Sequence, residues 1–150
     1  METARALKLA ETFLRIVHKV MENQKQPRHY GLNEKLYPAE IHSVMTIGNH
    51  ENVHVSELAR YLGITRGAAS QMIVKLEKKG LIEKTVDPEN ATRILLALTN
   101  KGKVAYYGHE QFHEEMDAPL FNYIDQLSDD QYAFAREFLQ RLEDMVDRMN

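Results

Sequence analysis

Apolar residues recur every three or four positions near both ends of the chain, which predicts amphipathic helices there. The first helix covers about residues 4–21. A later long helix is expected to begin after Thr99 and to end at Pro119, because proline interrupts helical hydrogen bonding. The last helix opens at Ser128 with the capping-box pattern Ser-x-x-Gln. Its apolar stripe consists of Tyr132, Ala135, Phe138, Leu139, Leu142, Met145, Val146 and Met149. Because this spacing continues to the final residues, we expect the first helix and the last two to pack against a second copy of the chain.

Shorter helical patterns occupy the middle of the chain. They cover about residues 38–48, 55–62 and 66–79, and Thr65 is well placed to cap the third of them. The turn Leu62-Gly63-Ile64-Thr65 joins the second pattern to the third. Two short helices around such a turn are typical of a helix-turn-helix, which places its second helix in the major groove of DNA.

Two β-prone runs follow, Leu81–Val86 and Arg93–Leu98, with the polar tip Asp87-Pro88-Glu89-Asn90 between them. Their separation predicts a β-hairpin whose loop is too long for a two-residue turn. The run Val53-His54-Val55 is a candidate third strand. A helix-turn-helix followed by a hairpin is the layout of a winged helix-turn-helix. The predicted fold class is therefore mainly α with a small β-wing, plus N- and C-terminal dimerisation helices.

A length of 150 residues suits one domain. Within the domain 1–150, we expect residues 38–98 to form the DNA-binding region, and residues 1–26 and 99–150 to supply the dimerisation helices. Cysteine is absent, which excludes disulfides and thiolate metal sites. No apolar run approaches the roughly 20 residues that cross a bilayer, and no signal peptide is recognisable. These features predict a cytoplasmic protein without a membrane partner.

The net charge of -3 hides an uneven distribution. Residues 1–50 carry +2 and residues 51–103 carry +3, whereas residues 104–150 carry -8. The basic charge therefore surrounds the predicted helix-turn-helix, so a locally positive DNA surface is compatible with an acidic protein.

The chain resembles the MarR family, the multiple-antibiotic-resistance type of transcriptional regulator, over nearly its whole length. The motifs that carry the resemblance are Ser56-Glu57-Leu58-Ala59, Leu76-Glu77-Lys78-Lys79-Gly80-Leu81-Ile82, Asp87-Pro88 and Leu98-Thr99-Asn100-Lys101-Gly102. The resemblance implies a homodimer that binds a near-palindromic double-stranded operator, usually as a repressor released by a ligand. An enzyme is not expected, because the sequence has no phosphate-binding glycine loop, no His-Glu-x-x-His and no nucleophile elbow.

The predicted DNA-binding residues are Thr65, Arg66, Gly67, Ser70, Gln71, Lys75 and Arg93. Arg66, Ser70 and Gln71 are candidates for base edges, since arginine suits guanine and glutamine suits adenine. Thr65, Lys75 and Arg93 are better suited to phosphates, which position the protein without specifying sequence. Gly67 allows close approach to DNA. The alternative is an ordinary solvated helix face.

The wing departs from the family pattern. The family usually has Asp-Arg-Arg after Asp-Pro-x, and an arginine there enters the minor groove. This chain has Asn90-Ala91-Thr92 and only then Arg93. Either Arg93 reaches DNA from a shifted position, or the minor-groove contact is weak and the salt dependence of binding is shallower.

Seven histidines are many for this length. His109 and His113 are four residues apart on a predicted helix, a spacing that lets two imidazoles bind one metal, and His42 is the candidate third ligand. The resemblance points the same way, because the corresponding positions bind zinc in zinc-responsive members of the family. The alternative is solvated surface, since glutamates surround the pair.

Two classes of function therefore stand. The first is a DNA-binding regulator that requires no cofactor and is controlled by zinc or by a small, often aromatic, acid. The second is a winged-helix module that binds proteins and never touches DNA. The outward positions predicted for Arg66, Gln71 and Lys75 favour the first.

Overall fold

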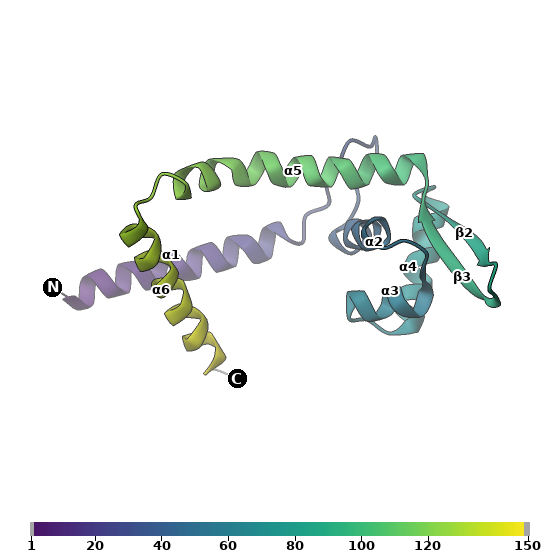
Figure 1. The fold of residues 1–150 in the computed structure, drawn as a ribbon. Coiled ribbons are helices and arrows are strands. Elements are labelled where there is room, and N and C mark those ends of the chain that lie inside the picture. Colours follow the sequence, from purple (N-terminus) through teal and green to yellow (C-terminus); the bar gives the residue numbers. More distant parts are fainter. Residues whose placement is uncertain (1, 149–150) are drawn as a thin grey trace. The chain divides into compact units, whose positions relative to one another are not determined.

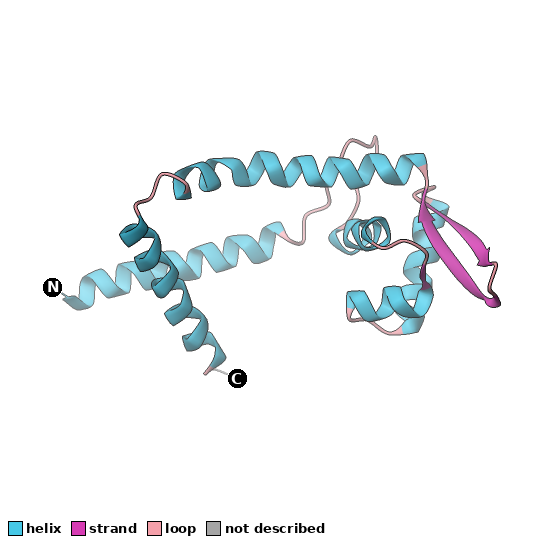
Figure 2. Ribbon diagram, in the orientation of Figure 1, coloured by secondary structure: helices cyan, strands magenta, loops and turns pink. Residues whose placement is uncertain are grey.

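The computed structural model describes residues 2–148 and contains two compact units. The boundary between them along the chain falls between Glu110 and Gln111. It is mainly helical with a small antiparallel sheet, as predicted (Figures 1 and 2). The elements are α1 (Glu2–Asn23), α2 (Pro38–Asn49), β1 (Val53–His54), α3 (Val55–Leu62), α4 (Arg66–Lys78), β2 (Ile82–Asp87), β3 (Asn90–Leu98), α5 (Asn100–Ile124) and α6 (Asp129–Asp147). Helix α5 begins in the first unit and ends in the second.

The core of the first unit lies between α2, α3, α4, the sheet and the start of α5. Its buried side chains are Leu36, Ile41, Val44, Ile47, Val53, Leu58, Ile73, Leu76, Leu81, Ile82, Leu96 and Ala105. Those in α2, α3 and α4 follow helical spacing, so each of these helices turns an apolar stripe inward, and the sheet, the loops and α5 supply the others. The winged helix-turn-helix therefore has a hydrophobic core of its own.

The ends of α3 and α4 are fixed by local chemistry that the sequence predicts. Thr65 has an extended backbone, and its hydroxyl accepts a 3.1 Å hydrogen bond from Ala68 N, which caps α4. Gly63 ends α3 with a φ of 65°, and Gly80 follows α4 with a φ of 72°. Residues with a Cβ disfavour this left-handed region, so glycine suits both positions. Two neighbouring helices with well-defined ends result.

The sheet has the order β1-β3-β2, with both pairs antiparallel. The prediction of a long hairpin loop is wrong, because only Pro88 and Glu89 separate the strands. The ladder is regular as far as the pair Val86–Ile94 and then shifts register to the pair Asp87–Asn90. The surplus residues are therefore absorbed as an irregularity inside β3 rather than as a loop.

The second unit contains the end of α5 and the whole of α6. The prediction that the helix ends at Pro119 is wrong, since α5 continues to Ile124. A proline removes one helical hydrogen bond, but the helical pattern resumes after it, and Asp125 N donates to the Phe121 carbonyl at 2.9 Å. The capping box at Ser128 is confirmed, with Gln131 Oε1 accepting from Ser128 N at 2.9 Å.

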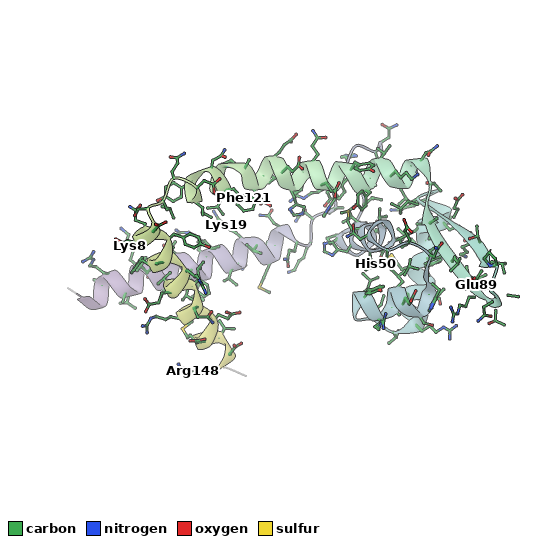
Figure 3. All side chains as sticks on the ribbon, in the orientation of Figure 1. Lys8, Lys19, His50, Glu89, Phe121 and Arg148 are labelled. Atoms are coloured by element: carbon green, nitrogen blue, oxygen red, sulfur yellow. The ribbon has the colours of Figure 1, made fainter. Side chains whose placement is uncertain are left out.

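Helices α1 and α6 leave their apolar side chains in contact with solvent. Within α6 no described side chain is buried. The exposed apolar residues of α1 are Leu7, Leu9, Leu14, Ile16, Val17, Val20 and Met21, and those of α6 are Tyr132, Phe134, Phe138, Leu139, Met145 and Val146. Figure 3 shows the described side chains projecting from both helices. Met149, the last member of the predicted stripe, lies outside the described residues. In the described part of the chain, no helix is both long and apolar enough to span a membrane.

Candidate nucleic-acid interface

The N-terminal half of α4 presents an open polar face. Thr65, Arg66, Gly67, Ser70 and Gln71 are all exposed, whereas Ala69, Ile73 and Leu76 on the opposite face are buried. The Ser70 hydroxyl donates 3.0 Å to the Arg66 carbonyl. The helix thus offers guanidinium, hydroxyl and carboxamide groups on one side, which is the chemistry that reads base edges in a major groove.

A side chain at position 67 would contact no other part of the described protein. A Cβ built at this position has no other atom within 4 Å. Packing inside the protein therefore does not require glycine here, and glycine costs helix stability relative to alanine. The open space at Gly67 is compatible with the close approach to DNA that the sequence predicts.

The structure adds Val74 to this face, a residue that the sequence analysis did not assign. Its side chain is 58% exposed, although it is apolar and lies in a helix with a buried stripe. Valine methyl groups suit contact with the methyl group of thymine. Helical spacing could have predicted this exposure, because residue 74 is four positions after Ser70 and three after Gln71 and so lies on the same face of α4.

Lys75 is engaged within the protein. Its ammonium lies 3.1 Å from Glu40 Oε1 and 5.5 Å from the centre of the Tyr37 ring. Lys79 Nζ lies 2.8 Å from the same carboxylate oxygen. Glu40 is completely buried, and burial opposes its ionisation, but the hydrogen bonds from Lys79 and the Tyr37 backbone and the nearby ammonium groups hold its pKa below the ordinary value. In the sequence, Glu40 resembles an ordinary acidic residue in the first turn of a helix, so nothing local predicts its burial or its pairing with two lysines.

The C-terminal end of α4 has further ties. Lys101 Nζ, from the first turn of α5, donates 2.7 Å to the Lys79 carbonyl and also pairs with Glu34. The Thr99 hydroxyl donates 2.6 Å to the Gly80 carbonyl. Side chains from α5 and from the segments next to it therefore hold the backbone where α4 ends.

The wing carries little free positive charge at its tip. Arg93 is about half exposed, and its Nη1 lies 3.8 Å from Asp87 Oδ2. Glu89 is exposed at the tip of the hairpin (Figure 3). The Asp87 side chain accepts from Glu89 N at 2.9 Å, and the Asn90 side chain accepts from Thr92 N at 3.1 Å. These hydrogen bonds within the hairpin fix the conformation of its tip. The tip therefore carries the acidic side chain of Glu89 at a position where a basic side chain would bind phosphates.

The three candidate metal ligands fall in both units. In the first unit, the rings of His42 and His109 are perpendicular, with centroids 6.3 Å apart, and the Tyr30 ring lies 5.3 Å from His109. Burial raises the pKa of the Tyr30 hydroxyl. In the second unit, His113 Nδ1 lies 3.6 Å from Asp117 Oδ2. Among the residues that the structure describes, no three metal-binding side chains are grouped as a ready site.

Known proteins share this sequence pattern. The MarR family model matches residues 36–102. The transcriptional repressor MprA of Escherichia coli is 32% identical over 138 residues, which cover 85% of this chain and 72% of MprA. Matches to curated relatives cover between 60% and 72% of their own lengths.

Solved structures share the fold. FabT from Streptococcus pneumoniae, crystallised in complex with DNA, gives a TM-score of 0.70 at 23% identity, covering 96% of this chain and 99% of the FabT chain. ZitR from Lactococcus lactis, a zinc-responsive MarR family member, gives a TM-score of 0.74 at 22% identity, covering 93% of this chain and 97% of ZitR. At such identities the likeness concerns the fold.

Proposed function

The chain belongs to the MarR family of transcriptional regulators, and from that premise we propose that it is a dimeric, sequence-specific DNA-binding repressor. The observation that carries this proposal is the exposed N-terminal half of α4. Its Arg66, Ser70 and Gln71 side chains stand on one solvent-facing side of a capped helix that follows a helix-turn-helix turn. A helix presented in this way fits a major groove.

The exposed apolar faces of α1 and α6 support the dimer. Most soluble proteins do not leave such a series of large apolar side chains in water, and larger exposed patches mark interaction sites. A second copy of the chain is the partner that we propose. A symmetric dimer would present two copies of α4 to half-sites about 34 Å apart, and the operator would therefore be pseudo-palindromic.

We propose that an effector controls binding, either a small organic acid or a divalent metal such as zinc. The contact between the His42 and His109 rings supports the metal, since neutral imidazole is a common zinc ligand and His113 follows four residues later in the sequence. The MarR relative ZitR is zinc-responsive. An effector acts only through its different affinities for the DNA-competent and incompetent states.

Selection of duplexes from a random library by the purified wild-type protein tests the proposal. Enrichment of a near-palindromic sequence is expected, and its affinity is then measured by fluorescence anisotropy at fixed salt. If no duplex is enriched, the alternative of a protein-binding winged helix gains support and DNA binding is rejected.

Metal control is tested in the same assay. Chelator-treated protein is titrated with the selected duplex with and without zinc, for the wild type and for a variant carrying His109→Ala and His113→Ala. A change of about tenfold on adding zinc corresponds to about 1.4 kcal/mol of coupling, and it should disappear in the variant. Binding that ignores zinc in both proteins would leave the organic effector as the candidate.

A further inference from the structure

A single buried carboxylate joins the start of α2 to the end of α4. Glu40, in the first turn of α2, is 0% exposed. Its Oε2 accepts a 2.7 Å hydrogen bond from Tyr37 N, which fixes the beginning of α2. Its Oε1 lies 2.8 Å from Lys79 Nζ and 3.1 Å from Lys75 Nζ, both of which project from the last turn or the cap of α4.

We propose that Glu40 is a positioning residue for DNA recognition: it sets the orientation of α4 without touching DNA, and Lys75 acts as part of this device rather than as a free phosphate contact. The inference rests on the proposed function, because it concerns how well the proposed reading helix discriminates between sequences.

The buried charge of Glu40 is costly unless cations stay close to it. Glu40 Oε1 is buried, and the ammonium groups of Lys75 and Lys79 lie within 3.1 Å of it, so they offset the loss of water around the charge. Removing the partner of a buried charge is strongly unfavourable. The position of α4 in which both Lys75 and Lys79 reach the same oxygen is therefore favoured over positions in which either one moves away.

The contacts that hold α4 lie at one end of the helix. Glu40 holds Lys75 and Lys79, and Lys101 holds the Lys79 carbonyl. All of these contacts are at the C-terminal half, whereas Arg66 and Gln71 are free in solvent at the N-terminal half. The axial distance from residue 77 to residue 66 is about 16 Å. A tilt of about 5° at the C-terminal end would then move the Arg66 end by about 1.4 Å. Donor–acceptor distances in hydrogen bonds vary by only a few tenths of an ångström, so this shift is enough to break a base contact.

The charge of Lys75 is partly compensated inside the protein. One carboxylate is shared by two ammonium groups, so the three side chains carry one net positive charge. The Lys75 ammonium also lies over the Tyr37 ring, 5.5 Å from its centre. Lys75 is thus directed by contacts inside the protein, and part of its charge is already neutralised before DNA arrives.

The decisive experiment compares Glu40→Gln with Glu77→Gln. Glutamine keeps an oxygen for the Tyr37 hydrogen bond and removes only the charge. Glu77 is also on α4 and pairs with Lys84 Nζ at 2.7 Å, but that pair is partly exposed and joins α4 to β2. Both variants add one unit of positive charge, so general attraction to DNA changes equally. The readout is the ratio of affinities for the selected duplex and for a shuffled duplex of the same composition, at fixed salt.

We expect Glu40→Gln to lower this ratio by about tenfold, comparable to the loss of one base contact, and Glu77→Gln to leave it at the wild-type value. Equal ratios for both variants and the wild type would overturn the inference while leaving the proposed function in place. A wild-type ratio near one would reject sequence-specific binding, and with it both proposals.

Lys75→Met tests the positioning role independently of Glu40→Gln. It serves in place of Glu40→Gln if circular dichroism shows that the latter does not fold. This variant keeps the Glu40–Lys79 pair, and the side chain it changes is about half exposed. A positioning role predicts that the ratio falls. An equal loss of affinity for both duplexes would make Lys75 a phosphate contact and overturn the inference.

Discussion

The winged helix-turn-helix and the helices α1 and α6 use apolar residues in opposite ways. In the former, side chains such as Leu58, Leu76 and Leu96 are almost completely buried within one chain. In the latter, Leu14 is 64% exposed and Leu139 is 63% exposed. The same helical spacing therefore has two outcomes: one region buries its apolar stripes in a core of its own, and the other leaves them exposed as surfaces of the kind that mark interaction sites.

The largest effect should come from disrupting the exposed face of α6. Leu139→Lys places a charge in the proposed dimer interface, so we expect monomers in analytical ultracentrifugation and a loss of operator affinity of about 100-fold or more, because two linked reading heads bind far better than one. For the oligomeric state, Val86→Lys changes a similarly exposed apolar residue and serves as the control; its operator affinity is not compared, because β2 belongs to the wing. Dimers that survive Leu139→Lys would show that α6 does not form the interface.

A matched pair of leucine substitutions sharpens the comparison of the two regions. Leu76→Ala removes a fully buried side chain and should cost about 2–5 kcal/mol in urea unfolding at any protein concentration. Leu14→Ala removes an exposed leucine side chain on α1. If dimerisation buries Leu14, the loss of unfolding free energy in this variant should depend on protein concentration. Concentration-independent costs for both would remove the distinction between the regions.

Within the winged helix-turn-helix, the reading face should respond through affinity rather than stability. Arg66→Ala is expected to lose about 1–3 kcal/mol of discrimination between the selected duplex and one with a changed base pair. Its unfolding free energy should stay within about 0.5 kcal/mol of the wild type, since Arg66 is exposed. Unaltered discrimination in anisotropy titrations would mean that Arg66 does not read a base.

Gly67→Ala should give the smallest change, with opposite signs in the two measurements. No atom opposes the added Cβ, so the free protein should gain about 0.4–1 kcal/mol of stability. Operator affinity should fall, because the methyl group would occupy space needed for close approach. If thermal unfolding and DNA titration both improved, close approach at Gly67 would be refuted.

Local chemistry made much of the fold predictable. The bounds of α3 and the cap at Thr65 follow from side-chain and glycine signals that act within a few residues, and both are confirmed. The continuation of α5 through Pro119 and the short connection in the wing were predicted wrongly. In both cases hydrogen bonding in the surrounding helix or hairpin overrides the local signal.

The candidate site was only partly predictable for a related reason. The exposed positions of Arg66, Ser70 and Gln71 follow from helical periodicity. The pairing of Glu40 with Lys75 and Lys79 depends instead on how α2 crosses α4, and residues 35 or more positions apart carry no local signal of contact. The proximity of His42 and His109 also comes from the packing of α2 on α5, but the sequence predicts it, because metal chemistry needs a third ligand and the family resemblance points to His42.

Placing α4 on DNA is the most direct test of the account. The chain contains no cysteine, so Gln71→Cys provides a unique attachment point for an iron–EDTA cleavage reagent. On the selected duplex, the account predicts cleavage around two successive major grooves, about one helical turn apart, and much weaker cleavage when the reagent is attached through Ser128→Cys. Cleavage at a single groove, or equal cleavage from both positions, would contradict recognition of DNA by α4 of a symmetric dimer.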